Sequence, residues 1–197
     1  MSRRVLKRLA ADTQGLTIIE FAFIAPTLLV MMMATFDLGF RGYVTSVLQG
    51  EVQKAARDAT LETGSASVSA LNAKVQTQVS KLVNNGTWTF SRRSYASFTR
   101  AGAAENFTDT NANGTRDAGE CYQDENGNSN WDADVGINGQ GTSNDIVVYT
   151  ATVAYPSLFP MYGLLGWPST ETISATTTLR NQPYGTQTLY TVTARCI

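Results

Sequence analysis

Histidine is absent from this chain of 197 residues, cysteine occurs only twice, and the formal net charge is −1. The lack of imidazole excludes histidine-based catalytic triads, histidine-containing zinc sites and histidine acid–base catalysis. Two cysteines are too few for a zinc site built from thiolates alone. The balanced charge, with no basic stripe among aromatic residues beyond the N-terminus, argues against a nucleic-acid partner. The composition therefore favours a structural or binding role over an enzyme.

Charged residues are also scarce between Leu16 and Phe36, where Glu20 is the only ionisable side chain. As a helix, this stretch would be about 31 Å long at roughly 1.5 Å per residue, which matches a hydrocarbon core of roughly 30 Å. The basic residues before it predict a cytoplasmic N-terminus and export of the chain after Phe36. No A-x-A-like cleavage site follows the apolar run, so we expect the helix to be retained as a single-pass anchor.

A carboxylate inside an apolar anchor needs an explanation, because a charged side chain at mid-bilayer costs about 2.5–3.5 kcal/mol. Glu20 would avoid this cost if it lay close enough to the cytoplasmic interface to reach water. A more specific pattern surrounds it: Gly15 ends a basic leader, Leu16 opens the apolar run, and Glu20, the fifth residue after the glycine, is followed by Phe21. This pattern resembles the processing site of type IV prepilins, and the Glu-Phe pair is most similar to the tight-adherence (Tad/Flp) class.

The resemblance implies a role for each of these residues. A membrane-bound prepilin peptidase would cut between Gly15 and Leu16 on the cytoplasmic side and remove residues 1–15. Glu20, with Phe21 beside it, would then offer a counter-charge to the new N-terminal amine when subunits pack helix to helix. A carboxylate and an ammonium that are buried together cost less than either group buried alone.

The longer run at residues 15–39, GLTIIEFAFIAPTLLVMMMATFDLG, resembles the N-terminal signature of TadE-like pilus assembly proteins. Residues 175–184 are similar to the end of such domains, although Gln182 stands where an acidic residue is usual. The resemblance implies a minor pilin or pseudopilin-like component of the bacterial inner membrane or the pilus. The partners it implies are the prepilin peptidase, other pilins or pseudopilins, and the inner-membrane assembly platform. It does not reach the middle of the chain, so it assigns no special role to the exported domain.

The periodicity of apolar residues predicts an α+β, pilin-like fold. After the anchor at residues 16–36, the helix should continue to about Leu61, and a second helix at 69–83 completes a helical region at 37–84. Residues 85–197 are β-rich, with strands expected around 88–90 and at 146–155, 172–179 and 188–194 in an antiparallel sheet packed on the long helix. The apolar segment at 157–168 is commonly explained by core burial, but a loop that dips toward the membrane or a partner contact would also fit.

A region rich in Asp, Asn and Gly, at residues 109–135, predicts calcium binding. Its first twelve residues, DTNANGTRDAGE, place glycine at position 6 and oxygen-bearing groups at positions 1, 3, 5, 7, 9 and 12, as an EF-hand loop does. These groups are Asp109, Asn111, Asn113, Thr115 (through its backbone carbonyl), Asp117 and Glu120. A solvated turn-rich loop is the alternative, because the same residue types favour turns. No apolar helical pattern flanks the loop, so we expect a bare calcium loop and not a calmodulin-like switch.

A second run with the same odd-numbered spacing follows directly. Its glycine, Gly127, comes two positions early, and no glutamate closes it, so Asp134 is expected to serve instead. Calcium ligation and simple turn formation are about equally compatible with this run. Its candidate ligands are Asp124, Asn126, Asn128, Asn130, Asp132 and Asp134.

The two cysteines, Cys121 and Cys196, both lie in the part that is expected to be exported. An intrachain disulfide and two free, partly buried thiols are both compatible with this placement. A bond would fasten the calcium-like region to the last predicted strand.

Two functions fit these patterns. The first is a non-enzymatic, pilin-like component of a Tad-type pilus, processed at Gly15 and carrying a calcium-stabilised domain. The second is a membrane-anchored, calcium-dependent binding or adhesion domain that never enters a fibre. A glycine-rich stretch at 136–141 lacks the strand-to-helix context of a phosphate loop and does not support an enzyme.

Overall fold

The computed structural model of the chain describes residues 14–60, 68–159, 163, 166 and 168–196. Side chains are described from residue 18 onward. Most of the predicted leader, residues 1–13, therefore lies outside the described residues, as does the side chain of Leu16.

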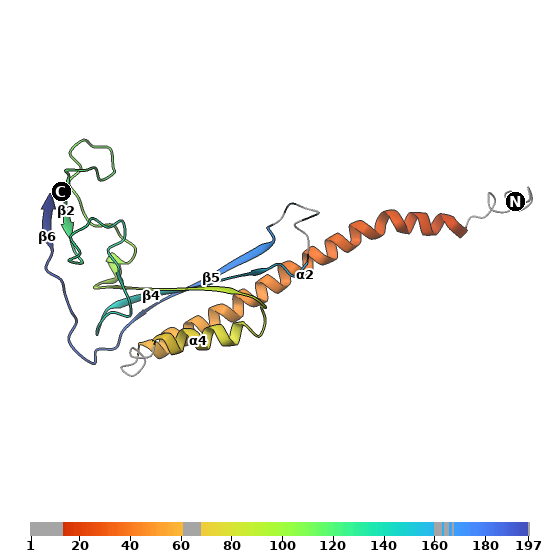
Figure 1. Cartoon of the computed structure of the whole chain (residues 1–197), viewed down its shortest axis with the longest axis horizontal. Coiled ribbons are helices and arrows are strands. Elements are labelled where there is room, and N and C mark those ends of the chain that lie inside the picture. Colours follow the sequence, from red (N-terminus) through yellow and green to blue (C-terminus); the bar gives the residue numbers. More distant parts are fainter. Residues whose placement is uncertain (1–13, 61–67, 160–162, 164–165, 167, 197) are drawn as a thin grey trace, which may run out of the picture. The chain divides into compact units, whose positions relative to one another are not determined.

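Helix α2, Gln14–Ala59, is a single helix of 46 residues that contains Pro26 (Figure 1). Its first half exposes large apolar side chains such as Ile18 and Phe23, which are 72% and 79% exposed. Among the described residues, α2 is the one helix long and apolar enough to cross a membrane. The C-terminal part instead buries one stripe at three- and four-residue spacing, which is the pattern of an amphipathic helix on a core. The buried residues of this stripe are Val44, Leu48, Val52, Ala55, Ala56 and Ala59.

Helix α4, Val68–Val79, begins one residue before the predicted second helix and buries Leu71, Val75 and Val79. The chain leaves the helix four residues earlier than the periodicity predicts. Val83 is still buried, because Val79 accepts hydrogen bonds from the N–H groups of both Leu82 and Val83 in a tight turn.

The main sheet has four strands in the order β3-β1-β4-β5, where β1 is Thr87–Tyr95, β3 is Ile137–Asn138, β4 is Ile146–Pro156 and β5 is Thr170–Arg180. Strand β1 pairs with β4 antiparallel over its whole length. Alternate residues of β4 are buried on one face of the sheet. On that face the Tyr149 hydroxyl donates to the side-chain oxygen of Asn72 in α4 at 3.0 Å, so the sheet packs against this helix. The opposite face presents hydroxyl pairs, such as Thr150 with Thr176 at 2.9 Å.

The prediction that residues 188–194 form the fourth strand of this sheet is wrong. Strand β6 is Thr193–Cys196, and it pairs with β2, Cys121–Asp124, in a separate two-stranded sheet. The chain before β6 is held by side-chain contacts instead: Gln187 donates to Asp145 at 2.7 Å, and the Thr188 N–H donates to Thr142 at 3.0 Å.

The described residues form two compact units, one within 1–43 and 156–171 and the other within 44–155 and 172–197. The second contains the sheets, α4 and the calcium-like region. Together these elements confirm the predicted α+β class, with a long apolar N-terminal helix followed by a domain with a small antiparallel sheet.

Candidate calcium loops and assembly helix

The first candidate loop, residues 109–120, is folded around its own first carboxylate. Asp109 accepts the backbone N–H of Gly114 at 2.7 Å and that of Asn113 at 3.2 Å. Gly114 has a φ of 77° and Ala112 one of 59°, so the loop turns through the left-handed region at positions 4 and 6. Calcium loops of the EF-hand kind use a glycine at position 6 for this turn.

Side chains at positions 3, 5 and 9 of this loop meet at one point. The side-chain amides of Asn111 and Asn113 each donate to the same oxygen of Asp117 at 2.7 Å. The side-chain oxygen of Asn113 also accepts the N–H of Thr115 at 2.8 Å. The structure therefore brings together the predicted ligands at positions 3, 5 and 9.

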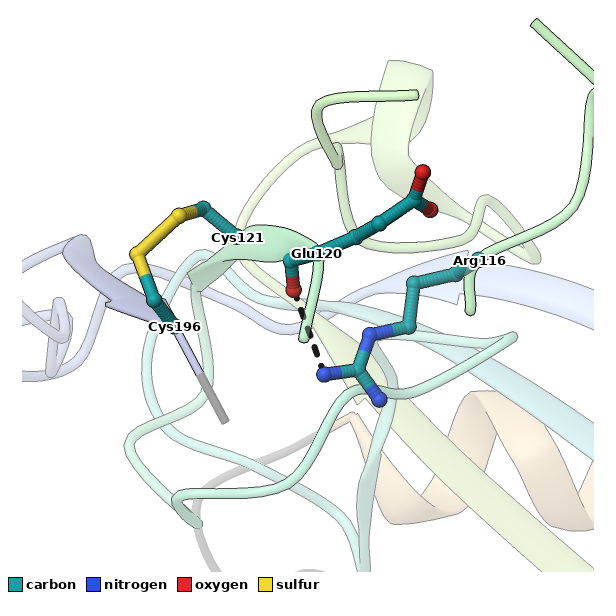
Figure 2. The surroundings of a disulfide bond; sticks show 4 residues. All are labelled: Arg116, Glu120, Cys121 and Cys196. Carbon is teal, nitrogen blue, oxygen red and sulfur yellow. Dashed lines mark hydrogen bonds between the residues drawn. A yellow bond between two sulfur atoms is a disulfide. The ribbon is translucent and has the colours of Figure 1, made fainter. Parts of the chain in front are cut away.

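Glu120, at position 12, closes the first loop. One of its carboxylate oxygens accepts the N–H of Thr110 at 2.7 Å, and the other accepts the N–H of Asp117 at 3.0 Å. These two N–H groups, Asp117 before Thr110, hold the pKa of Glu120 below its usual range. Figure 2 shows the Glu120 carboxylate pointing away from the adjacent disulfide, while the Arg116 side chain donates to the Glu120 backbone oxygen at 3.2 Å.

The second candidate loop, which begins at Asp124, repeats most of these contacts at the same positions. Asp124 accepts the N–H of Ser129, at position 6, at 3.0 Å. The amides of Asn126 and Asn128 both donate to one oxygen of Asp132, at 2.8 and 2.6 Å. The N–H of Asn130, at position 7, donates to Asn128 at 2.7 Å, as Thr115 does to Asn113 in the first loop.

The early glycine of the second loop is explained by its backbone. Gly127, at position 4, has a φ of 76°, and Ser129, at position 6, has one of 66°. Both loops thus use the left-handed region at positions 4 and 6, and each has a glycine at only one of these two positions: position 6 in the first loop and position 4 in the second. The displaced glycine therefore does not count against the second loop.

Glu105 closes the second loop, and sequence analysis missed it. Its carboxylate accepts the N–H of Glu125 at 2.8 Å with one oxygen and the N–H of Asp132 at 3.1 Å with the other. Those N–H groups occupy positions 2 and 9, the same positions that donate to Glu120 in the first loop. Glu105 is only 1% exposed. It precedes both loops in the chain, so no spacing rule within either loop could have identified it.

Asp134, which was expected to close the second loop, has other partners. It forms an ion pair with Arg93 and accepts hydrogen bonds from the Tyr95 hydroxyl at 3.2 Å and the Gly136 N–H at 3.0 Å. These contacts turn its carboxylate toward β1. The expectation is therefore corrected in favour of Glu105.

Cys121 and Cys196 form a disulfide, and they are opposite each other in the β2–β6 pair (Figure 2). Beside it, the Arg195 guanidinium donates to Asp124 at 2.6 Å. Burial of the Asp124 carboxylate opposes its charged form, but the bonds from Arg195 and from the N–H groups of Ser129 and Gly127 outweigh this effect. The pKa of Asp124 consequently lies below its usual range.

Within the described part of the chain, no group of three or more histidine, cysteine, aspartate or glutamate side chains is placed to hold a metal ion. Any cation in these loops would need amide and backbone oxygens as well as carboxylates. Calcium accepts such mixed oxygen ligands.

The predicted assembly residues lie on α2. Glu20 is exposed and Phe21 is 65% exposed, so neither side chain has an intrachain core to enter. Gly15 and Leu16 are part of the helical backbone.

Comparison with known proteins finds a related family for the N-terminal helix. The family model described as TadE-like protein matches residues 15–59, which span nearly all of α2 and confirm the TadE-like resemblance of the N-terminal segment. No curated protein and no solved structure matches the chain. The match supports a component associated with a Tad-type pilus, and the TadE-like family is structural and not a family of enzymes.

Proposed function

We propose that this TadE-like chain is a minor pilin or pseudopilin-like component of a Tad-type pilus, which assembles through α2 and carries a calcium-stabilised domain. The observation that carries the proposal is the coincidence of the family match, residues 15–59, with one continuous helix whose first half is apolar and exposed. A helix of this kind can leave the bilayer only by exchanging lipid for neighbouring helices.

In this proposal the prepilin peptidase cuts between Gly15 and Leu16. The helix then anchors the chain in the bacterial inner membrane, with the later domain periplasmic or, in a fibre, extracellular. Glu20 pairs with the N-terminal amine of an adjacent pilin, and the assembly platform moves the subunit into the fibre. The exposure of Glu20 on α2 supports this pairing, because its carboxylate is available to a neighbouring subunit.

The test is Glu20→Ala in the producing bacterium, with Glu51→Ala on the same helix as a matched control. We expect Glu20→Ala to insert in the membrane but fail to support piliation, while Glu51→Ala supports it. Intact mass of the purified wild-type protein should correspond to a chain that begins at Leu16. Normal pili with Glu20→Ala would contradict the counter-charge, and an uncleaved N-terminus would contradict the pilin-like function as a whole.

We further propose that both loops hold calcium, with Glu120 and Glu105 as their closing carboxylates. Three features of each loop support this. The side chains at positions 3 and 5 converge on position 9, and the first carboxylate accepts the N–H of position 6. A buried glutamate also accepts the N–H groups of positions 2 and 9. A half-turn of each asparagine amide exchanges its NH2 group and its oxygen, so the same convergence of side chains would present oxygens to a cation.

Calcium titration of thermal stability tests the metal proposal. A site at a calcium concentration of 100 times its Kd should add about 2.7 kcal/mol to the free energy of unfolding. Asp109→Ala should remove the contribution of the first loop and leave that of the second. A melting temperature that changes with neither calcium nor a chelator would exclude both sites without affecting the role of α2.

The alternative is a membrane-anchored binding or adhesion domain that uses calcium but stays out of the fibre. The observation in its favour is that the family match ends at residue 59, so the whole β-rich domain lies beyond it. Fractionation separates the two functions: a pilus component should be recovered in sheared fibres, and a simple anchored domain only in membranes.

A further inference from the structure

Arg92 of β1 is buried without an acidic partner among the described residues. It is only 7% exposed, and none of the ion pairs in the described part of the chain includes it. Its Nη1 donates to the side-chain oxygen of Asn72 in α4 at 2.9 Å, and its guanidinium carbon lies 3.9 Å from the centre of the Tyr149 ring. Loss of hydration lowers the pKa of Arg92, and Tyr149 offsets this only in part. A buried charge in this state is costly unless an anion pairs with it.

The other two nitrogens of Arg92 form an unused hydrogen-bonding edge. Nε and Nη2 are both buried, and neither has a hydrogen-bond partner among the described residues. These two atoms lie on the same edge of the planar guanidinium, so their N–H groups point in parallel. Such an edge matches the two oxygens of a carboxylate, which arginine binds through a pair of N–H···O bonds.

Arg92 lines a hollow that also involves α4 and the end of β3. The hollow has a volume of about 300 Å³, and Asn72, Phe90 and Asn138 contribute to its walls. Gly139, at the same place, has a φ of 122°, and an added Cβ there would meet no atom within 4 Å. A hollow of this size is at the lower end of the range of ligand pockets. It therefore suits one side chain or the end of a larger partner.

The hollow adjoins a free edge of β1. Strand β4 pairs with one edge of β1 over its whole length, whereas β3 pairs with the other edge over only two residues. The Gly139 N–H donates to the Arg92 carbonyl at 3.0 Å, so the backbone groups of Arg92 face this second edge. Backbone groups alternate between the two edges along a strand, so those of Trp88 and Phe90 face it as well. No strand in the described part of the chain pairs with them, and such an edge can accept an added strand.

We propose that this site binds an extended peptide segment of another chain, whose carboxylate pairs with Arg92 while its backbone continues the line of β3 along Trp88 and Phe90. The unpaired guanidinium edge selects a carboxylate, and the free backbone edge beside it selects a peptide over a small anion such as phosphate. The partly buried rings of Trp88 and Phe90 stack with their centroids 5.8 Å apart and offer apolar contacts to the segment. This contact is separate from assembly through α2 and does not depend on calcium.

Binding of synthetic peptides to the full chain in lipid nanodiscs tests the proposal. The probes are N-acetylated TVSVTV with a free C-terminal carboxylate, the same peptide as its C-terminal amide, and an amide with aspartate at its centre. We expect a carboxylate peptide to bind at least about tenfold more tightly than the uncharged amide, as a charge-assisted hydrogen bond would give. The two carboxylate peptides distinguish a chain terminus from an acidic side chain as the source. Hydrogen exchange at the Trp88 and Phe90 amides should slow when the peptide binds.

Variants separate the paired N–H groups from the charge. Arg92→Gln removes the charge and Arg92→Lys keeps it without the paired N–H groups, so both should weaken binding about tenfold. Arg180→Gln, at an exposed arginine of β5, is the matched control and should bind as the wild type does. Equal binding of acid and amide peptides to the wild-type chain would overturn the proposal without the need for any variant. Carboxylate-dependent binding that leaves exchange at Trp88 and Phe90 unchanged would overturn the added strand.

Discussion

The two candidate calcium loops have similar backbone conformations and place their main side chains at the same positions, but they are closed by carboxylates from different parts of the chain. The first is closed by Glu120, the last residue of its own twelve. The second is closed by Glu105, which lies 20 residues before Glu125 and 27 before Asp132. A closing carboxylate is therefore defined by the two N–H groups that it joins and not by its place in a motif. The first loop is a local unit, whereas the second depends on the folding of the domain around it.

The loops also differ in charge. Asp109 accepts bonds from its own loop, whereas Asp124 is fully buried and paired with Arg195 of β6. Calcium affinity rises with the number of charged ligands in a loop. We therefore expect the first loop to bind calcium more tightly than the second, because Arg195 neutralises part of the second.

Removing the disulfide should cause the largest change in stability and should affect the two loops differently. Replacing both Cys121 and Cys196 by serine should lower the free energy of unfolding by about 3–4 kcal/mol, since the bond closes a long loop. Denaturant unfolding measures the loss, and reduction of the wild-type protein should reproduce it. The second loop should lose more of its calcium response than the first, because its first carboxylate, Asp124, lies in the β2–β6 strand pair that the bond fastens. An equal loss in both loops would contradict the distinction between a local and a dependent loop.

Glu105→Gln should have the next largest effect. The new NH2 group would face a backbone N–H and leave it without an acceptor in a buried site, at a cost of about 2–3 kcal/mol. Calcium titration should then show a second loop that no longer responds and a first loop that does.

Glu120→Gln is the matched control and should give the reverse pattern. Denaturant unfolding and calcium titration of both variants in parallel provide the measurement. If Glu105→Gln left the calcium response of the second loop intact, its closing role would be disproved.

Acid should weaken both loops for different reasons. The pKa values of Glu120 and Asp124 are lowered in the folded state, by loop N–H groups in the first case and by Arg195 with loop N–H groups in the second. A carboxylate with a lowered folded pKa contributes stability above its unfolded pKa of about 4, and this contribution is lost as pH falls through the folded pKa.

Stability measured by denaturant unfolding should therefore be steady near neutral pH and fall below about pH 4. Arg195→Gln should move the acid transition to higher pH, whereas Arg57→Gln on α2 should not. An unchanged transition with Arg195→Gln would show that the ion pair contributes nothing.

The smallest effects should come from the glycines. Gly114→Ala should cost about 1 kcal/mol, because its φ of 77° is left-handed and its surroundings are open. Gly127→Ala should cost more, since an added Cβ would also lie 3.2 Å from the Tyr190 ring. Thermal unfolding compares the two directly. A lower cost at 127 than at 114 would mean that Tyr190 moves away freely.

The sequence predicted the structure correctly where the interactions that determine it are local. The spacing of Val44, Leu48 and Val52 predicted the amphipathic part of α2, and the β-branched run at 146–155 predicted β4 almost to the residue. The convergence of positions 3, 5 and 9 in the first loop follows from the same kind of local regularity, while calcium binding there remains a prediction. Strand β3, with only two residues, has no periodicity to detect. The pairing of β6 with β2 and the role of Glu105 depend on contacts between distant segments, which no local pattern contains.

The disulfide affects when the exported domain can finish folding. Its two cysteines are 75 residues apart, so in the proposed orientation the bond waits until everything between them has crossed the membrane. The first loop can take its shape as soon as it emerges, whereas the second begins at Asp124 in β2, a strand whose partner β6 is exported last. A subunit that reaches the assembly machinery before this bond forms would therefore carry an incompletely folded domain, and oxidation in the periplasm would determine when folding is complete.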